Sequence, residues 1–472
     1  MREAVVDLVI VGGGPAGQAA AAVASNAGLS VLMYDEQAQM GGQILRQPPA
    51  AMRVAGWLPG RAYRRLKVQL ARARDLEGVE WRGRRSVTAV FPREDGEPGY
   101  VVLAVPTDGG DHERVVTRRL LVAAGCYDLP FPIPGWTLPG VTSAGALQAF
   151  VKSQQLVSSD RLVLAGTHPL QLILADQIQA AGGKVAMVLF AQSFGQMARG
   201  VLARPYAALR HVNLLLEAAA AFMRVRKAGT PIRFGWVVSE VEGRSRVEAV
   251  RTRTANDQSE FHPCERVALC FGFTPQTDLP RALGASARVA PGAGGWAILA
   301  DGWGRTDRAH LYVAGETTGV SGALGAMEEG HLAGLAIAID TGKLAEPHAR
   351  RLGLSARRRI RRINGFARLI EKVADPTEFL FSLVTRETIV CRCEGVTRAQ
   401  IEEALSSASP PGSPSAVKLI TRAGMGLCQG RNCEHIVRRL VSERDPEGNQ
   451  AMGGYTPRMP VRPAPIGSLA AG

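Results

Sequence analysis

Two parts of the chain alternate short apolar runs with small-residue helical segments and polar turns. Each part reads as a strand, a helix and a second strand; the segments are, in chain order, 5–11, 18–26 and 30–34, then 161–166, 170–181 and 184–190. Apolar runs of this length bounded by glycine are typical of strands buried in parallel sheets. The pattern therefore predicts an α/β chain built on two βαβ units.

The turn after the first strand carries the clearest binding pattern, Gly12-Gly13-Gly14-Pro15-Ala16-Gly17. Gly12 permits a tight turn, Gly14 lets the backbone approach a pyrophosphate, and Gly17 lets the helix pack close to the strand. The free N–H groups where the helix begins, around Pro15 and Ala16, face the phosphates.

An acidic pair completes this pattern at the end of the second strand. Asp35 follows Gly17 by 18 residues, with Glu36 beside it. A carboxylate at this distance accepts the ribose hydroxyls of a dinucleotide. We therefore predict a site for an adenine dinucleotide, the alternative being a glycine-rich packing turn.

The corresponding turn of the second unit departs from the pattern. It reads Gly166-Thr167-His168-Pro169-Leu170-Gln171, and no carboxylate follows the strand that ends at Phe190. Side chains at positions 168 and 171 crowd both the pyrophosphate and the helix. We expect a Rossmann-like fold that does not bind NAD(P). His168 has no paired acid in the sequence, so we interpret it as an inert loop residue.

Near the C-terminus, Cys391-Arg392-Cys393 is followed after 34 residues by Cys428 and then Cys433. Four thiolates are what a [2Fe-2S] cluster requires; a zinc ion held by the same four is the alternative. Thr397 and Gln400 predict a capped helix between the pairs. Cys126, Cys264 and Cys270 form no C-x-x-C, so disulfide chemistry is not expected.

The strand at 311–314 leads into Gly315-Glu316, which predicts that the chain returns to the first domain. The resulting division is a nucleotide domain at 1–145 and 266–340, a second nucleotide-type domain at 146–265, an Arg-rich helical connector at 341–388, a cysteine module at 389–441 and a Pro/Gly-rich tail at 442–472. We expect the tail to lie along a surface, with plain disorder as the alternative.

Charge and hydropathy limit the partners. Lys and Arg number 56 against 42 Asp and Glu, a net charge of +14, but aromatic residues are only 6% and no nucleic-acid motif appears. We expect no nucleic acid, and a basic solvated surface or a docking face for an acidic partner instead. No stretch approaches the ~20 apolar residues of a transmembrane helix. No secretion signal is visible either. We expect a cytoplasmic protein, with peripheral attachment to the inner face of the membrane left open.

Residues beyond the first turn carry a family resemblance over about 5–340. The stretches Gly41-Gly42-Gln43, Ala123-Ala124-Gly125, and Gly315-Glu316 with Gly319, Gly322 and Ala323 resemble motifs of the two-dinucleotide-binding-domain flavoproteins. The resemblance implies FAD, with the Gly315-Glu316 position near its ribityl and phosphate part and the next helix aimed at the flavin. It adds these residues to the cofactor site: Gly42, Gln43, Ala124, Gly125, Gly315, Glu316, Gly322 and Ala323.

The cysteine module has a resemblance of its own. Cys391-Arg392-Cys393-Glu394 and Gly424-Met425-Gly426-Leu427-Cys428-Gln429-Gly430-Arg431 resemble the bacterioferritin-associated-ferredoxin-like [2Fe-2S] domain. The whole chain, including Pro134 to Val141, is similar to the larger FAD-binding subunits of heteromeric dye-linked amino-acid dehydrogenases, the D-hydroxyproline dehydrogenase, opine oxidase and hydrogen cyanide synthase type. Where relatives carry Gly-Ala-x-Glu-Arg this chain has Gly125-Cys126-Tyr127-Asp128-Leu129, which puts contacts of that charged pair in doubt.

This second resemblance implies a division of labour. A smaller FAD-dependent subunit oxidises the substrate, and the present chain passes electrons through flavin and cluster to a quinone or other acceptor. FMN at an interface between subunits and a small ferredoxin-like subunit belong to the same expectation. No general base stands out, so catalytic residues stay unassigned. The alternatives are an NAD(P)H-dependent flavoprotein reductase and a scaffold subunit holding ADP or ATP in place of FAD, with a structural cluster.

Overall fold

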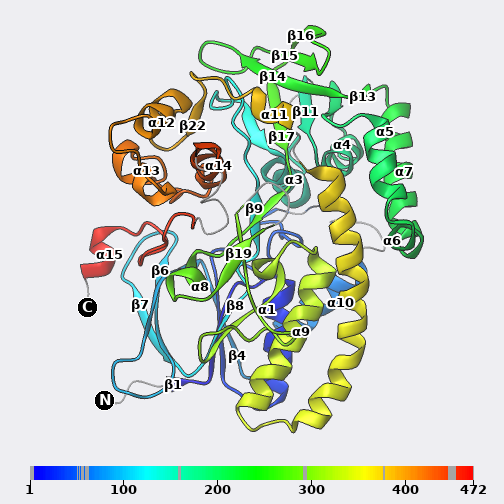
Figure 1. Cartoon of the computed structure of the whole chain (residues 1–472). Coiled ribbons are helices and arrows are strands. Elements are labelled where there is room, and N and C mark those ends of the chain that lie inside the picture. The colour runs from blue at the N-terminus through cyan, green and yellow to red at the C-terminus, as the bar shows by residue number, and fades with distance from the viewer. Residues whose placement is uncertain are drawn as a thin grey trace.

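The computed structural model describes residues 5–49, 51–52, 54, 58, 63–157, 161–290, 295–375, 378–444 and 453–470. Two five-stranded parallel sheets form its centre (Figure 1). In sheet order the first holds β21 (Leu311–Val313), β8 (Leu120–Val122), β2 (Leu8–Val11), β3 (Val31–Asp35) and β4 (Val79–Gly83). The second holds β10 (Val141–Ser143), β17 (Arg266–Cys270), β11 (Leu162–Gly166), β12 (Met187–Phe190) and β13 (Ile232–Phe234). The predicted α/β class is confirmed.

Two helices pack closely beside the first sheet, α1 (Pro15–Asn26) and α9 (Ala323–Asp340). Glycines on α9 make the close approach possible, since a Cβ on Gly330 would lie 2.0 Å from the carbonyl oxygen of Ala16. One on Gly334 would lie 2.8 Å from the Cβ of Val23. The packing brings the start of α9 to the glycine turn that opens α1.

The predicted first strand is divided in the structure. β1 (Val5–Val6) pairs with β7 (Glu113–Thr117) in a four-stranded sheet with β6 (Tyr100–Pro106) and β5 (Arg85–Pro92), and only β2 enters the central sheet. Asp7 separates the two, because its carboxylate accepts hydrogen bonds from the backbone and hydroxyl of Ser30 and pairs with Arg118. The sequence pattern, read as one strand over 5–11 despite Asp7, did not indicate this change of sheet.

The second unit contains α3 (Ala144–Gln154) and α4 (Leu170–Ala180) beside its sheet, then a run of three helices, α5 (Phe194–Leu202), α6 (Pro205–Arg210) and α7 (Val212–Lys227). An antiparallel sheet of β14 (Trp236–Glu242), β15 (Ala249–Thr254) and β16 (Ser259–Pro263) follows. β10 and β17 pair in the second sheet, although the sequence division assigned both to the first domain. Isolated apolar runs do not show which sheet they join, and we propose the same division with these two strands moved.

A single long helix, α10 (Glu346–Ala374), and the short α11 (Glu378–Ser382) connect to the cysteine module. The module holds β22 (Ile389–Cys391), β23 (Val396–Thr397), α12 (Arg398–Leu405), α13 (Pro414–Thr421) and α14 (Glu434–Arg444). The predicted capping box of Thr397 and Gln400 is confirmed at the start of α12.

The module packs against the second unit as a continuation of one apolar core. The rings of Phe131 and Phe381 lie 5.0 Å apart, and Trp136 donates a hydrogen bond of 2.7 Å to the carbonyl of Ile389. The described part of the tail, 453–470, runs over the module and the first unit and ends in α15 (Ile466–Ala470). Within the described residues, no helix combines the length and the apolar character needed to cross a membrane.

Candidate flavin cleft and cysteine centre

A cavity of about 630 Å³ opens at the carboxyl ends of the first sheet's strands. Fourteen of the fifteen cofactor residues predicted from the sequence line it: Gly12, Gly14, Pro15, Ala16, Asp35, Glu36, Gly42, Gln43, Ala124, Gly125, Gly315, Glu316, Gly322 and Ala323. Gly17 does not, because it lies against the strand turn, where an added Cβ would be 2.0 Å from the carbonyl oxygen of Gly12.

The glycine turn leaves room where a pyrophosphate would lie. A Cβ added to Gly14 would meet nothing nearer than the Cα of Gly42 at 3.9 Å. Gly12, at φ +110°, has the left-handed conformation that favours glycine, and a Cβ there would be 2.3 Å from the Ala123 carbonyl oxygen. Gly14 caps α1 without a side-chain bond, so the first N–H groups of the helix face open space. This shape and polarity fit a dinucleotide phosphate.

The two acids at the end of β3 have different surroundings. Asp35 accepts hydrogen bonds of 2.7 Å from the backbone N–H groups of Gly13 and Gln37, while burial raises the pKa of its carboxyl. Glu36 accepts a 2.9 Å bond from the Ser86 hydroxyl and lies 3.6 Å from the guanidinium of Arg462. Arg462 belongs to the tail, which therefore forms part of the cleft wall.

A buried thiol and carboxyl face each other farther along the cleft. The Cys126 Sγ donates to a carboxylate oxygen of Glu316 at 2.6 Å, and burial raises the pKa of both groups. The thiol and the carboxyl therefore form a buried hydrogen-bonded pair in the cleft wall. Nearby, the Thr317 and Ser321 hydroxyls are buried with no protein partner, as expected for groups that await a bound polar molecule.

The other end of the cleft presents an ammonium group. Lys152, on α3, donates a 3.2 Å hydrogen bond to the carbonyl of Gln43, and burial lowers the pKa of Lys152 to about 8. Asp128 also lines this end and accepts bonds from Ser143 Oγ at 2.8 Å and Gly145 N at 3.0 Å. The sequence analysis did not identify Lys152 or Asp128 as a site residue, because neither belongs to a recognised binding motif.

Glu329 lies beside Gly315, and its burial is expected to make the stability of the fold depend on pH. Its carboxylate accepts bonds from the backbone N–H of Gly315 at 3.0 Å and the Thr318 hydroxyl at 2.9 Å, and burial raises the pKa of Glu329 to about 7. A carboxyl whose pKa is raised by folding stabilises the folded chain below pH ~4.5, and this contribution is lost as pH rises through ~7.

We expect Glu329→Gln, which keeps the accepting oxygen, to match the wild type near pH 5 and to melt at a higher temperature at pH 8. Thermal unfolding from pH 5 to 8 measures this, with the exposed Glu403→Gln as control. Parallel melting curves for wild type and Glu329→Gln would show that Glu329 does not titrate in this range.

The second nucleotide turn is filled by its own side chains. His168 accepts a 3.1 Å bond from Leu170 N, its ring lies edge-on to Phe273 at 5.3 Å, and burial lowers the pKa of His168 to about 4. The Gln171 side chain is fully buried behind Gly166. These contacts agree with a structural role for His168. That NAD(P) does not bind here stays a prediction.

The four predicted cysteines come together in the module as two pairs. Cys433 donates a hydrogen bond to Cys391, which lowers the pKa of Cys391 to about 6. Cys428 and Cys393 form the second pair through a side-chain hydrogen bond. Among the residues described, no three His, Cys, Asp or Glu side chains gather around one point. Two thiolates at each of two irons is how four cysteines hold a [2Fe-2S] cluster, so this donor set fits the cluster.

Backbone and tail enclose the thiols. Gly424 N donates to the Cys391 Sγ at 3.4 Å, a contact that stabilises a thiolate. The ring of Tyr455 packs against Gly424 and Gly430, the glycines on either side of Cys428. A Cβ added to Gly424 would lie 2.5 Å from this ring, and one added to Gly430 would lie 2.3 Å from it. Its hydroxyl is 3.8 Å from the Cys433 Sγ. Tyr455 comes from the tail, and nothing in the local sequence indicated that it would reach the cysteines.

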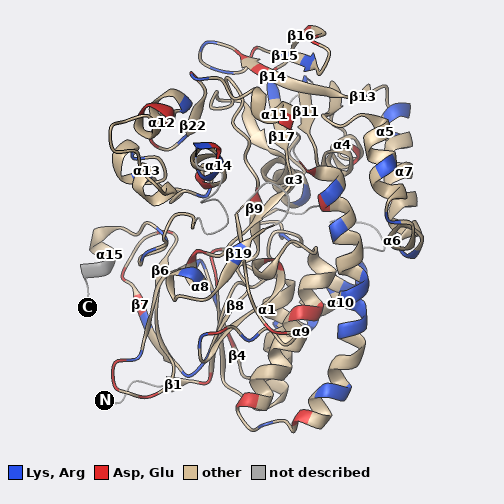
Figure 2. Cartoon of the chain, viewed as in Figure 1, with Lys and Arg blue, Asp and Glu red and all other residues tan. Residues whose placement is uncertain are grey.

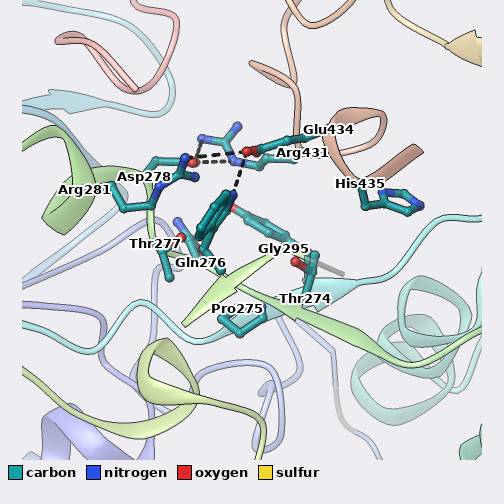
Figure 3. A pocket seen from close by; sticks show the side chains of 12 residues that line it. Thr274, Pro275, Gln276, Thr277, Asp278, Arg281, Gly295, Arg431, Glu434 and His435 are labelled. Atoms are coloured by element: carbon teal, nitrogen blue, oxygen red, sulfur yellow. Dashed lines mark hydrogen bonds and ion pairs between the residues drawn. The ribbon is translucent and has the colours of Figure 1, made fainter. Parts of the chain in front are cut away.

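Two ion pairs join the module to the cleft around a small cavity of about 30 Å³ (Figure 3). The module supplies the arginine of one pair and the glutamate of the other. Arg431 of the module bonds Asp278, at the start of α8 (Asp278–Ala282), at 2.8 Å. Arg281 of α8 lies 3.5 Å from Glu434 of the module. Arg431 also donates to the carbonyl of Cys428 at 3.0 Å, while Asp278 lines the cleft. One side chain thus connects a cysteine loop to the wall of the nucleotide site.

The remaining contacts of this junction keep its carboxylates paired. Glu434 accepts bonds from Trp296 Nε1 at 2.7 Å and Tyr455 N at 2.9 Å, although burial raises the pKa of its carboxyl. Trp296 comes from β20 (Trp296–Ile298), which pairs with β19 (Ala287–Val289), and β9 (Cys126–Asp128) and β18 (Phe273–Pro275) form the adjoining ladder. The junction is therefore a fixed interface.

We expect Arg431→Met to destabilise the chain by ~3–5 kcal/mol, because the half-buried carboxylate of Asp278 loses its partner. Asp278→Asn combined with Arg431→Met should recover a large part of this loss. Thermal unfolding of the four proteins of this double-mutant cycle measures the coupling. Strictly additive effects of the two substitutions would contradict the pairing.

Comparison with known proteins shows the family to which the chain belongs. A family model described as Pyridine nucleotide-disulphide oxidoreductase matches residues 6–330, and one for the BFD-like [2Fe-2S] binding domain matches 389–443. The chain is 32% identical to one of the subunits of opine oxidase from Rhizobium meliloti, over 98% of this chain and 87% of that one. It is 31% identical to Hydrogen cyanide synthase subunit HcnB of Pseudomonas aeruginosa, over 98% and 97%.

Two solved structures share the fold. L-proline dehydrogenase from P. horikoshii superposes with a TM-score of 0.71 at 18% identity, over 99% of this chain and 80% of that chain. Thioredoxin reductase from T. acidophilum superposes with a TM-score of 0.52 at 18% identity, over 72% and 99%. The chain belongs to the pyridine nucleotide-disulphide oxidoreductase family, as an FAD-dependent oxidoreductase that carries a BFD-like [2Fe-2S] domain and groups with HcnB and the matching opine oxidase subunits.

Proposed function

We propose that the chain is the FAD- and iron-sulfur-containing subunit of a heteromeric dehydrogenase that oxidises an amino acid or imino acid of the D-hydroxyproline or opine type. The observation that carries the proposal is the junction of Arg431 with Asp278, which connects the cysteine loop to the wall of the nucleotide cleft. The relatives named as subunits of opine oxidase and hydrogen cyanide synthase support the class of reaction.

The proposed roles follow from the contacts. FAD accepts an electron pair from a carbon–hydrogen bond, and a [2Fe-2S] cluster transfers electrons singly. Gly12 and Gly14 would admit the pyrophosphate, Asp35 would accept the ribose hydroxyls, and Glu316 would face the ribityl chain. Cys391, Cys393, Cys428 and Cys433 would hold the cluster. The Cys126–Glu316 pair would form the buried wall of the cleft at this position.

Among the residues that the structure describes, none forms an evident site of substrate oxidation. Burial lowers the pKa of Lys152 in the cleft to about 8, but its side chain is bonded to the Gln43 carbonyl. We therefore assign substrate oxidation to a smaller FAD-dependent partner subunit. The acceptor is a quinone or another electron carrier. FMN at the interface between subunits and a ferredoxin-like subunit complete the proposed assembly.

The test is purification of the intact complex, identification of the released nucleotides, and a dye-reduction screen with D-hydroxyproline, octopine, nopaline, glycine and proline. We expect FAD in this chain and reduction of the dye by one class of these substrates. Adenine nucleotide without isoalloxazine in this chain would favour a scaffold subunit. Rapid bleaching of the flavin by NADH would favour an NAD(P)H-dependent reductase, and failure with every amino acid would contradict the dehydrogenase proposal.

A further inference from the structure

Helices α5, α6 and α7 expose an unusual amount of apolar side chain to solvent. Of the 23 exposed large apolar side chains among the described residues, eight lie between positions 194 and 223. They are Phe194, Leu202, Tyr206, Leu209, Val212, Leu214, Leu216 and Met223, and we call them the α5–α7 surface. Leu209 and Leu202 are 74% and 73% exposed. α5 and α6 bury no residue of their own.

This concentration is larger than scattered surface residues account for. A monomeric soluble protein exposes single apolar side chains over its whole surface, whereas a contiguous patch marks an interaction site. Position 202 ends α5, positions 206 and 209 lie on α6, and positions 212 and 216 lie on α7, so each of the three successive helices exposes apolar side chains to solvent.

The excess positive charge of the chain lies beside this surface. Residues 194–227 hold six Lys and Arg and one Glu, and α10 holds nine Lys and Arg and two Glu, so these two segments carry twelve of the fourteen net charges. Asp176 and Glu328 offset two of them by pairing with Arg224 and Arg359. Figure 2 shows these cations along α10, α5 and α7.

The basic helix and the apolar surface form one continuous face. α10 packs against α5 and α6. Arg362 on α10 donates to the carbonyl of Arg210 on α6, and its own carbonyl is 3.1 Å from a ring nitrogen of His211. The guanidinium of Arg210 stacks on the Tyr206 ring at 4.4 Å. Apolar anchors with stacked arginine at their rim are the composition of a protein–protein interface.

From this face we infer the docking site of the catalytic partner subunit: the α5–α7 surface and the adjoining arginines of α10 bind an apolar patch rimmed by acidic side chains on that subunit. The inference rests on the proposed heteromeric function. The net positive charge of this face favours an acidic partner subunit over a second copy of this chain. A second copy of this chain in a two-fold contact would bring the same face against itself, which sets about ten net positive charges against ten others within a screening length of ~8 Å.

An anionic membrane is the other occupant that basic and apolar side chains could fit. Two features favour a protein. The apolar residues come from three successive helices rather than one continuous amphipathic helix. Glu217, exposed directly beside Leu216, places a carboxylate within the surface, where an acidic bilayer would repel it.

The experiment uses the full chain co-expressed with the separately encoded FAD-dependent subunit. Leu209→Asp combined with Leu216→Asp places two carboxylates within the surface. Phe91→Asp combined with Phe261→Asp is the matched control, because both phenylalanines are exposed on strands of other sheets. Association is measured by titration of the two purified proteins at two salt concentrations, and complex mass by light scattering. Melting temperature and visible absorption check the fold and the cofactors.

We expect the leucine pair to weaken association with the FAD-dependent subunit on the order of 100-fold without loss of cofactors, and the phenylalanine pair to leave it unchanged. Higher salt should weaken the wild-type complex, because the rim is charged. Equal association of leucine variant and wild type would overturn the inference while leaving the proposed function intact. A wild type that forms no complex would overturn both.

Two further measurements test the other two possible binding partners of this surface, an anionic membrane and a second copy of this chain. Sedimentation with vesicles of anionic lipid, lost in the leucine variant while the subunit still binds, would assign the surface to a membrane and overturn the inference. A dimer of this chain alone that becomes monomeric in the leucine variant, with subunit binding retained, would assign it to a second copy and overturn it equally.

Discussion

We expect Cys391→Ala and Cys433→Ala to leave a chain that lacks the visible absorption of the cluster but keeps that of the flavin, holds almost no iron and does not reduce the dye. Both thiols lie in the core of the cysteine module, 1% and 0% exposed, among Val390, Val417 and Ile436. A module of about 55 residues has too small a core to depend on apolar burial alone, so metal binding contributes to its folding free energy. Loss of either ligand therefore has two effects: it removes the electron path, and it lowers the stability of the module.

Iron content, visible absorption and thermal unfolding of the full complex measure the effect. Cys264→Ala is the matched control, because Cys264 is equally buried but lies outside the module. It should keep its iron, its colour and its activity. A wild-type chain that shows flavin absorption alone and contains one zinc would contradict the cluster. So would a Cys433→Ala variant with unchanged iron.

The parts of the site that the sequence predicted depend on local pattern. The order strand, Gly12 to Gly17, helix, strand and Asp35 is contained within about thirty residues, and its geometry follows from the conformational freedom of glycine. The two cysteine pairs are likewise recognisable from spacing. For such motifs the backbone that positions the residues is encoded beside them, so the structure brings them to one cleft and one centre.

The parts that were not predicted depend on contacts between distant segments. Tyr455 reaches the cysteines and Arg462 reaches the nucleotide cleft from a tail whose composition alone suggests extension or disorder. The Arg431–Asp278 pair joins residues 153 positions apart. Neither charge shows a periodicity or spacing that identifies its partner. The break at Asp7 is similar, because its cause is the Ser30 side chain across the sheet.

Substitutions at two glycines of the same turn distinguish the effect on nucleotide binding from the effect on the packing of α1. A Cβ on Gly17 would lie 2.0 Å from the carbonyl oxygen of Gly12, which is backbone and cannot move away cheaply. Gly14 has a φ of −75° and no atom within 3.9 Å of an added Cβ, so a side chain there is accommodated by the empty protein. The same side chain would occupy the space that a pyrophosphate needs.

We therefore expect opposite results from the same substitution. Gly17→Val should destabilise the chain by ~3 kcal/mol or more through overpacking. Gly14→Val should cost the fold only ~1 kcal/mol, the loss at a helix N-cap, while weakening nucleotide binding on the order of 100-fold. Thermal unfolding and the nucleotide released per chain measure the two effects. If Gly14→Val retained a full complement of nucleotide, the dinucleotide would not cross this turn, and the 630 Å³ cavity would have to bind it in another way.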